Sequence, residues 1–102
     1  MRLRPVLPPG NGSFETGFKV AGAASSTLTV SSTASQSPVL IKALSTNAGI
    51  VYVGGAGALP TAATGFPLSA NDEIEIPAGD LVMISVMSVP AGQEVRFIYS
   101  PA

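Results

Sequence analysis

Four carboxylates lie close together in the second half of the chain, at Asp72, Glu73, Glu75 and Asp80. Paired carboxylates can act as the acid and base of a glycosidase, and carboxylates near loops can bind calcium. Their spacing does not match an EF-hand loop, and alternation with isoleucines places Glu73 and Glu75 on one face of a strand. We therefore expect a solvated or interface edge here, rather than a catalytic or calcium site.

Three glycines at positions 54, 55 and 57 form a cluster of the kind found in phosphate-binding loops. Such a loop needs a following helix N-terminus and usually a Lys, Ser or Thr at a defined spacing. Ala58, Leu59 and Pro60 follow and supply neither feature. We expect a flexible or tightly packed loop.

The chain contains no cysteine and no histidine. These absences exclude disulfides, thiolate chemistry, the common zinc sites and any Ser-His or Cys-His nucleophile pair. The sequence therefore predicts a protein that is not an enzyme and that needs no cofactor or metal.

Charged residues make up only 11% of the 102 residues, hydrophobic residues 46%, and the net charge is -1. Because large apolar patches are rarely left open on monomers, we expect copies of the protein to cover one another. Five scattered cations cannot form the basic face that nucleic acid requires. The chain has neither a membrane-spanning apolar run nor the apolar region of a secretory signal, so we expect no membrane partner and synthesis in a cytoplasm.

Short apolar segments that alternate with period two are separated by turn residues at intervals of roughly ten residues. This pattern predicts an all-β fold, a single antiparallel β-sandwich or jelly roll of about seven or eight strands in residues 23–102. Its centre is residues 39–57, VLIKALSTNAGIVYVGGAG. We expect a hairpin here, with Asn and Gly of the STNAG turn in left-handed conformations.

Other segments give further expectations. Leu28 and Val30 alternate with threonines and predict a half-buried strand. Residues 73–76 and 95–99 alternate in the same way. Residues 81–86, LVMISV, predict a buried strand, with Met83 and Met87 filling gaps in the core.

Residues 1–22 are expected to form an extended N-terminal arm and loop. Prolines and glycines exclude a helix and a central strand from the first twelve residues, and Gly17 and Gly22 argue against a helix that the spacing of Phe14 and Phe18 would otherwise suit. The arm carries cations and apolar anchors that could contact a neighbouring subunit: Arg2, Leu3, Arg4, Val6 and Leu7.

The aromatic residues are four phenylalanines and two tyrosines, and there is no tryptophan. We expect the phenylalanines in the core and Tyr52 at a subunit interface, where its apolar ring and polar end are both useful. Because so few aromatic rings are available for a sugar-binding face, a glycan is not the expected partner.

Residues 39–99 resemble a family of small virion proteins of tailed bacteriophages. The similar parts are VLIKALSTNAGIVYVGGAG, GFPLSANDEIEIPAGDL and VPAGQEVRFIYS, in that order. They are structural turns and strands rather than reactive residues. The resemblance implies a β-sandwich, often trimeric, that decorates the phage head as a cement protein or, less often, belongs to the tail or a fibre.

From this resemblance we expect a homotrimer that is made in the host cytoplasm. It would bind the major capsid protein on the outer capsid surface and stabilise the junctions between capsid subunits. A tail, neck or fibre component and a glycan-binding receptor-recognition module stay open as alternatives. Residues 1–10 lie outside the resemblance, and we place the attachment contacts there.

Overall fold

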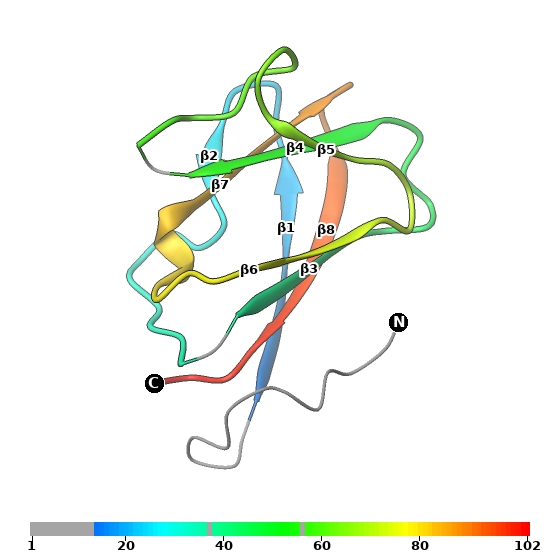
Figure 1. Ribbon diagram of the computed structural model, residues 1–102. Helices are drawn as coiled ribbons and strands as arrows, with labels where there is room; N and C mark the ends of the chain where they lie inside the picture. The colour runs from blue at the N-terminus through cyan, green and yellow to red at the C-terminus, as the bar shows by residue number, and fades with distance from the viewer. Residues whose placement is uncertain (1–13, 37, 56) are drawn as a thin grey trace.

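The computed structural model describes residues 14–36, 38–55 and 57–102 (Figure 1). They form two four-stranded antiparallel sheets, which confirms the predicted all-β sandwich. Sheet A has the order β1-β8-β3-β6, and sheet B has the order β2-β7-β4-β5. The elements are β1 (Glu15–Ala21), β2 (Ser26–Thr27), β3 (Val39–Ala43), β4 (Ile50–Gly55), β5 (Phe66–Leu68), β6 (Glu73–Ile76), the 3-10 helix η1 (Leu81–Met83), β7 (Ile84–Val89) and β8 (Gln93–Tyr99).

The strands pair in a nested way, first with last. β1 pairs with β8, β2 with β7, β3 with β6 and β4 with β5, each time antiparallel. Further ladders between β3 and β8 and between β4 and β7 complete the two sheets. The chain therefore changes sheet at every connection between consecutive strands except the one between β4 and β5.

The predicted hairpin in residues 39–57 is wrong, although both of its strands exist. β3 lies between β8 and β6 in sheet A, whereas β4 lies between β7 and β5 in sheet B. The Asn47 side chain holds this crossing in place, because its Nδ2 donates to the Glu94 carbonyl at 2.9 Å and its Oδ1 accepts from the Glu94 N–H at 3.0 Å. Asn47 thus pairs with β8 as a strand backbone would.

The glycine of the same connection has a steric role. A Cβ on Gly49 would meet the Val89 carbonyl oxygen and would lie 2.5 Å from Pro90 Cδ. Among the described residues, positive φ angles occur at Asn71 and Gly92, and at none of the residues of the STNAG turn. The expectation of left-handed backbone in the STNAG turn is therefore wrong.

The core lies between the two sheets and is built from alternating residues of their strands. Val95, Phe97 and Tyr99 of β8 are buried, and Ile74 and Ile76 of β6 pack against the same core. Both alternating segments thus form the strands that were predicted. The largest fully buried side chains are Ile41, Leu68, Leu81, Ile84, Val39, Val51, Val86 and Val95.

Residues 15–21 form β1, so the expectation of a loop there is wrong. The strand pairs with β8 along its whole length and thereby belongs to the sandwich. Gly17 was the residue that argued against regular structure. The Phe97 ring occupies the space beside it, and Phe97 Cζ lies 2.5 Å from the position that a Gly17 Cβ would take.

Two other segments differ from expectation. In the segment predicted as a strand over residues 81–86, Leu81–Met83 is a 3-10 helix and the strand begins only at Ile84. Met87 is buried, but Met83 is 53% exposed and does not fill a gap in the core. The strand predicted around Leu28 and Val30 is limited to Ser26–Thr27, and Val30 is 95% exposed.

Candidate functional site

The four clustered carboxylates, Asp72, Glu73, Glu75 and Asp80, have different surroundings in the structure. Asp80 caps η1: its Oδ1 accepts from the N–H groups of Thr33 at 2.7 Å and Val82 at 3.0 Å, and its Oδ2 accepts from the Ser32 hydroxyl. The Ser32 hydrogen bond, followed by those from Thr33 and Val82, lowers the pKa of Asp80 below its ordinary value. Asp80 therefore ties a loop to η1.

The other three carboxylates lie at and beside the edge strand β6. Asp72 accepts from the Ser69 N–H at 2.9 Å and closes the turn before the strand. In the register of the sheet, Glu73 is opposite Lys42 and Glu75 is opposite Leu40. Among the described residues, no group of three or more acidic, His or Cys side chains is placed to hold a metal ion.

The glycine cluster belongs to a tightly packed loop on sheet B. A Cβ on Gly54 would lie 2.9 Å from the Ala58 carbonyl oxygen and 3.0 Å from Pro60 Cδ and N. Ser85, which is opposite Gly54 in the register, is fully buried. Its hydroxyl has no hydrogen-bond partner in the described part of the chain. The loop thus packs directly on β4 at Gly54.

The side chains on the outside of sheet A form a surface that we call the outer face. Since Val95, Phe97 and Tyr99 point inward, the alternating residues of β8 point outward, and the register extends their rows across the sheet. One row runs Thr16, Ile98, Leu40, Glu75, and the next runs Phe18, Arg96, Lys42, Glu73. Val20 opposite Glu94 continues the face.

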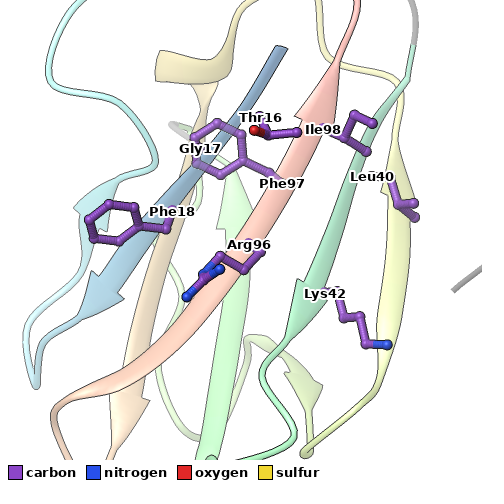
Figure 2. Close-up of a pocket in the computed structure, with 8 residues that line it drawn as sticks. All are labelled: Thr16, Gly17, Phe18, Leu40, Lys42, Arg96, Phe97 and Ile98. Atoms are coloured by element: carbon purple, nitrogen blue, oxygen red, sulfur yellow. The ribbon is translucent and has the colours of Figure 1, made fainter. Parts of the chain in front are cut away.

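The outer face is hollowed over β1, β8 and β3, and the hollow has a volume of about 600 Å³ (Figure 2). The guanidinium carbon of Arg96 is 6.0 Å from the centre of the Phe18 ring, within the range of a cation–π contact. Arg96 Nε also donates to Glu94 Oε2 at 2.7 Å. The residues that line the hollow are Thr16, Gly17, Phe18, Leu40, Lys42, Arg96, Phe97 and Ile98.

Apolar side chains gather along β1 at the open side of this face. Phe14 is 63% exposed, Phe18 65% and Val20 50%. The expectation that the phenylalanines pack in the core is wrong for these two and for Phe66, and right for Phe97. β1 is an edge strand, and no other described segment covers its outer side chains. The alternation of Phe18, Lys19 and Val20 was the available signal, and the glycines nearby concealed it.

The residues proposed as contacts from the sequence do not converge on this face. Arg2, Leu3, Arg4, Val6 and Leu7 lie outside the described residues. Tyr52 is half-buried on β4 of the other sheet, where its Cβ is 2.7 Å from the position that a Gly65 Cβ would take. Tyr99 is buried, and its burial, with a smaller effect of Glu15, raises its pKa.

Comparisons with known proteins identify no relative: no family model matches the chain, and no curated protein is similar to it at a significant level. In the described part of the chain, no helix is long and apolar enough to span a membrane.

Proposed function

We propose that this protein is a non-enzymatic structural protein of a tailed-phage virion. In this proposal it is a decoration, or cement, protein that binds the major capsid protein on the outer capsid surface as a homotrimer and stabilises capsid subunit junctions. The observation that carries the proposal is the outer face of sheet A, where Phe18 and Val20 of β1 are half or more exposed. Apolar surface of this kind marks an interaction site.

The size of the face favours many copies acting together. Four strands about 4.8 Å apart and about six residues long give a face on the order of 400 Å². A stable interface needs roughly 800 Å² from each partner. One face alone is therefore too small for strong binding, but a trimer that presents three of them gains affinity through multivalency.

The nested strand order supports the same proposal at the level of the fold. We infer that the order β1-β8-β3-β6 against β2-β7-β4-β5 is the predicted jelly-roll topology. In a jelly roll the first strand pairs with the last, the second with the second to last, and so on, as the strands do here. Viral capsid domains use this architecture, and so do lectins. The fold alone does not assign a function, so the virion assignment depends on the experiments below.

Light scattering on the purified protein tests the assembly. We expect a particle of three times 10.2 kDa for the wild type and a shift towards smaller species for Phe18→Ala. Phe66→Ala is the matched control, because Phe66 is also an exposed phenylalanine, at 55%, but belongs to β5 of sheet B. A clean monomer of 10.2 kDa would contradict the trimer.

Electron cryomicroscopy of the virion tests the location. A decoration protein should be present in hundreds of copies on the outer head. A few copies at the tail or neck would contradict it and support a tail, neck or fibre component.

The hollow itself favours a second candidate, a glycan-binding module for receptor recognition. Its Phe18 ring is exposed and has the Arg96 guanidinium beside it, a pairing that could stack on a sugar and bind its polar groups. A glycan array with Phe18→Ala as the control tests this candidate. Absence of binding by the wild type at millimolar ligand would count against it.

A further inference from the structure

We propose that β1 is the edge through which two copies of this chain pair. The two β1 strands run antiparallel about a two-fold axis at Gly17, and the two four-stranded A sheets become one continuous sheet. The inference goes beyond the proposed function, because a two-fold contact cannot build a trimer. Where the trimer also forms, β1 links one trimer to the next.

β1 differs from the other edge strands of the sandwich. β2 has two residues, β5 has three with Pro67 in the middle, and β6 has four and is followed by Pro77. Short length and proline are features by which sheet edges avoid pairing with other chains. β1 has seven residues and no proline, and in the described part of the chain only β8 pairs with it. Its other side offers a row of backbone N–H and C=O groups to a strand of a second molecule.

The two charged residues of β1 have no ion-pair partner in the described part of the chain. In the register with β8, Glu15 is opposite Tyr99 and Lys19 is opposite Val95, and both of these β8 residues are buried. Glu15 and Lys19 therefore lie on the same side of the strand. They are about 13 Å apart along it, too far to pair with each other. Their partners must come from another molecule.

A second copy of β1 supplies both partners. Residues directly opposite each other in an antiparallel pair lie on the same side of the sheet. When the two-fold axis lies at Gly17, Glu15 of each copy is opposite Lys19 of the other. The contact then contains two ion pairs, one on each side of the axis.

Neighbouring registers lack this complementarity. An axis at Phe18 would place Lys19 opposite Gly17 and Glu15 opposite Ala21, without an ion pair. An axis at Lys19 would place two ammonium groups opposite each other, which destabilises a strand pair. The charges of β1 therefore select the axis at Gly17.

The apolar side chains of β1 match in the same register. Phe14 lies opposite Val20 of the second copy, and Thr16 lies opposite its Phe18. Phe14, Phe18 and Val20 are all half or more exposed in the single chain. Aromatic and β-branched side chains that face each other across two strands stabilise the pair. Pairing thus gathers the exposed apolar side chains of both copies at the axis.

The outer faces of the two copies stay open, because the strands join through their edges. One face is on the order of 400 Å², so the joined face is on the order of 800 Å², the area that a stable interface takes from each partner. The edge contact itself is narrow, and we expect weak pairing that strengthens when copies are held side by side.

Exchange of the two charges tests the pair on the full chain. Glu15→Lys places ammonium groups opposite each other, and Lys19→Glu does the same with carboxylates. Each variant alone should therefore pair more weakly, by up to about 25-fold at low salt for the two ion pairs. A mixture of the two variants, one of them tagged, restores both ion pairs and should recover wild-type pairing. Sedimentation over a concentration series measures each case.

Glu73→Lys is the matched control for this exchange. It makes the same change of charge on β6, the opposite edge of sheet A, and should leave the pairing unchanged. Equal weakening by Glu73→Lys and Glu15→Lys would show an effect of net charge and would overturn the contact at β1.

Disulfide trapping determines the register, because the natural chain contains no cysteine. In a mixture of Thr16→Cys and Phe18→Cys chains, the two cysteines are directly opposite, with Cβ atoms about 5 Å apart, close to disulfide geometry. In either chain alone the two cysteines lie diagonally, about 7–8 Å apart. We expect the disulfide in the mixture and its loss in the separate chains. A disulfide formed as readily by Phe18→Cys alone would place the axis at Phe18 and overturn the proposed pair.

The outcomes separate this inference from the proposed function. A mixture of Glu15→Lys and Lys19→Glu that pairs no better than either variant would overturn the β1 contact, even where the trimer persists. A chain that forms no trimer but recovers pairing in the mixture would contradict the trimer and support the β1 contact. A wild type that stays monomeric at millimolar concentration would overturn both.

Discussion

The outsides of the two sheets differ in how they are covered. On sheet B, the loop after β4 packs against Gly54, and Ser85 and Met87 of β7 are buried. On sheet A, Phe18 and Val20 stay half or more exposed, and Arg96 is exposed between the β1 and β3 rows. The exposed apolar side chains of sheet A thus lie along β1, whereas Leu40 in the middle of the same face is only 9% exposed. This difference supports the proposal that a partner binds sheet A at β1.

Phe18 and Phe97 lie on the neighbouring strands β1 and β8 and point to opposite faces of sheet A. Phe97 faces the core and Phe18 faces outward. Phe97→Ala should lower the free energy of unfolding by about 3–5 kcal/mol, because it removes a buried aromatic ring and leaves a cavity. Phe18→Ala should lower it by at most about 1 kcal/mol, which is the contribution of an exposed cation–π contact. Urea unfolding measures both, and equal losses would contradict the assignment of faces.

The cover on sheet B can be broken by a single substitution. Gly54→Val should destabilise the fold by about 1–3 kcal/mol, since its side chain would collide with the backbone at Ala58 and Pro60. The displaced loop would expose Ser85 and make this sheet resemble the open one. Gly57→Ala is the control, because a Cβ there meets nothing within 4 Å. Thermal unfolding and amide exchange at Ser85 report the result, and unchanged protection at Ser85 would argue against a cover.

The smallest effect is expected at Asp80, which belongs to neither outer face. Its pKa is lower in the folded protein than the ordinary value of 3.8 because of its hydrogen bonds. The stabilisation it provides is therefore complete above pH 3.8 and is lost as the pH falls through the lower folded pKa. Asp80→Asn should reduce stability at neutral pH and flatten the acid side of the stability profile. Unfolding curves collected between neutral and strongly acidic pH would show this, and a profile parallel to the wild type would contradict it.

Local patterns predicted the strands whose two faces differ. Ile74 and Ile76 alternate with glutamates, and Val95, Phe97 and Tyr99 alternate with polar or exposed residues, so burial of one face followed directly. The apolar runs in residues 39–57 also predicted the two central strands, β3 and β4. Their connection was not, because a polar turn between two apolar strands looks the same whether the chain returns in one sheet or crosses to the other.

The candidate site was harder to predict because it depends on what is absent around it. Gly17 indicated a loop, and only the Phe97 ring from the far end of the chain makes it suitable for a strand. The exposure of Phe18 depends on sheet A having no third layer in the described structure, which composition does not encode.

The position of β8 has a consequence for how the protein forms in the cell. β8 lies between β1 and β3, the first and third strands, so sheet A cannot close until residues 93–99 have been synthesised. Non-local pairing of this kind folds slowly, on a timescale of about milliseconds to seconds. Until then β1 and β3 both have a vacant edge, so a chain truncated before Gln93 would be prone to aggregation. Sheet A thus depends on the seven residues of β8 to join β1 to β3.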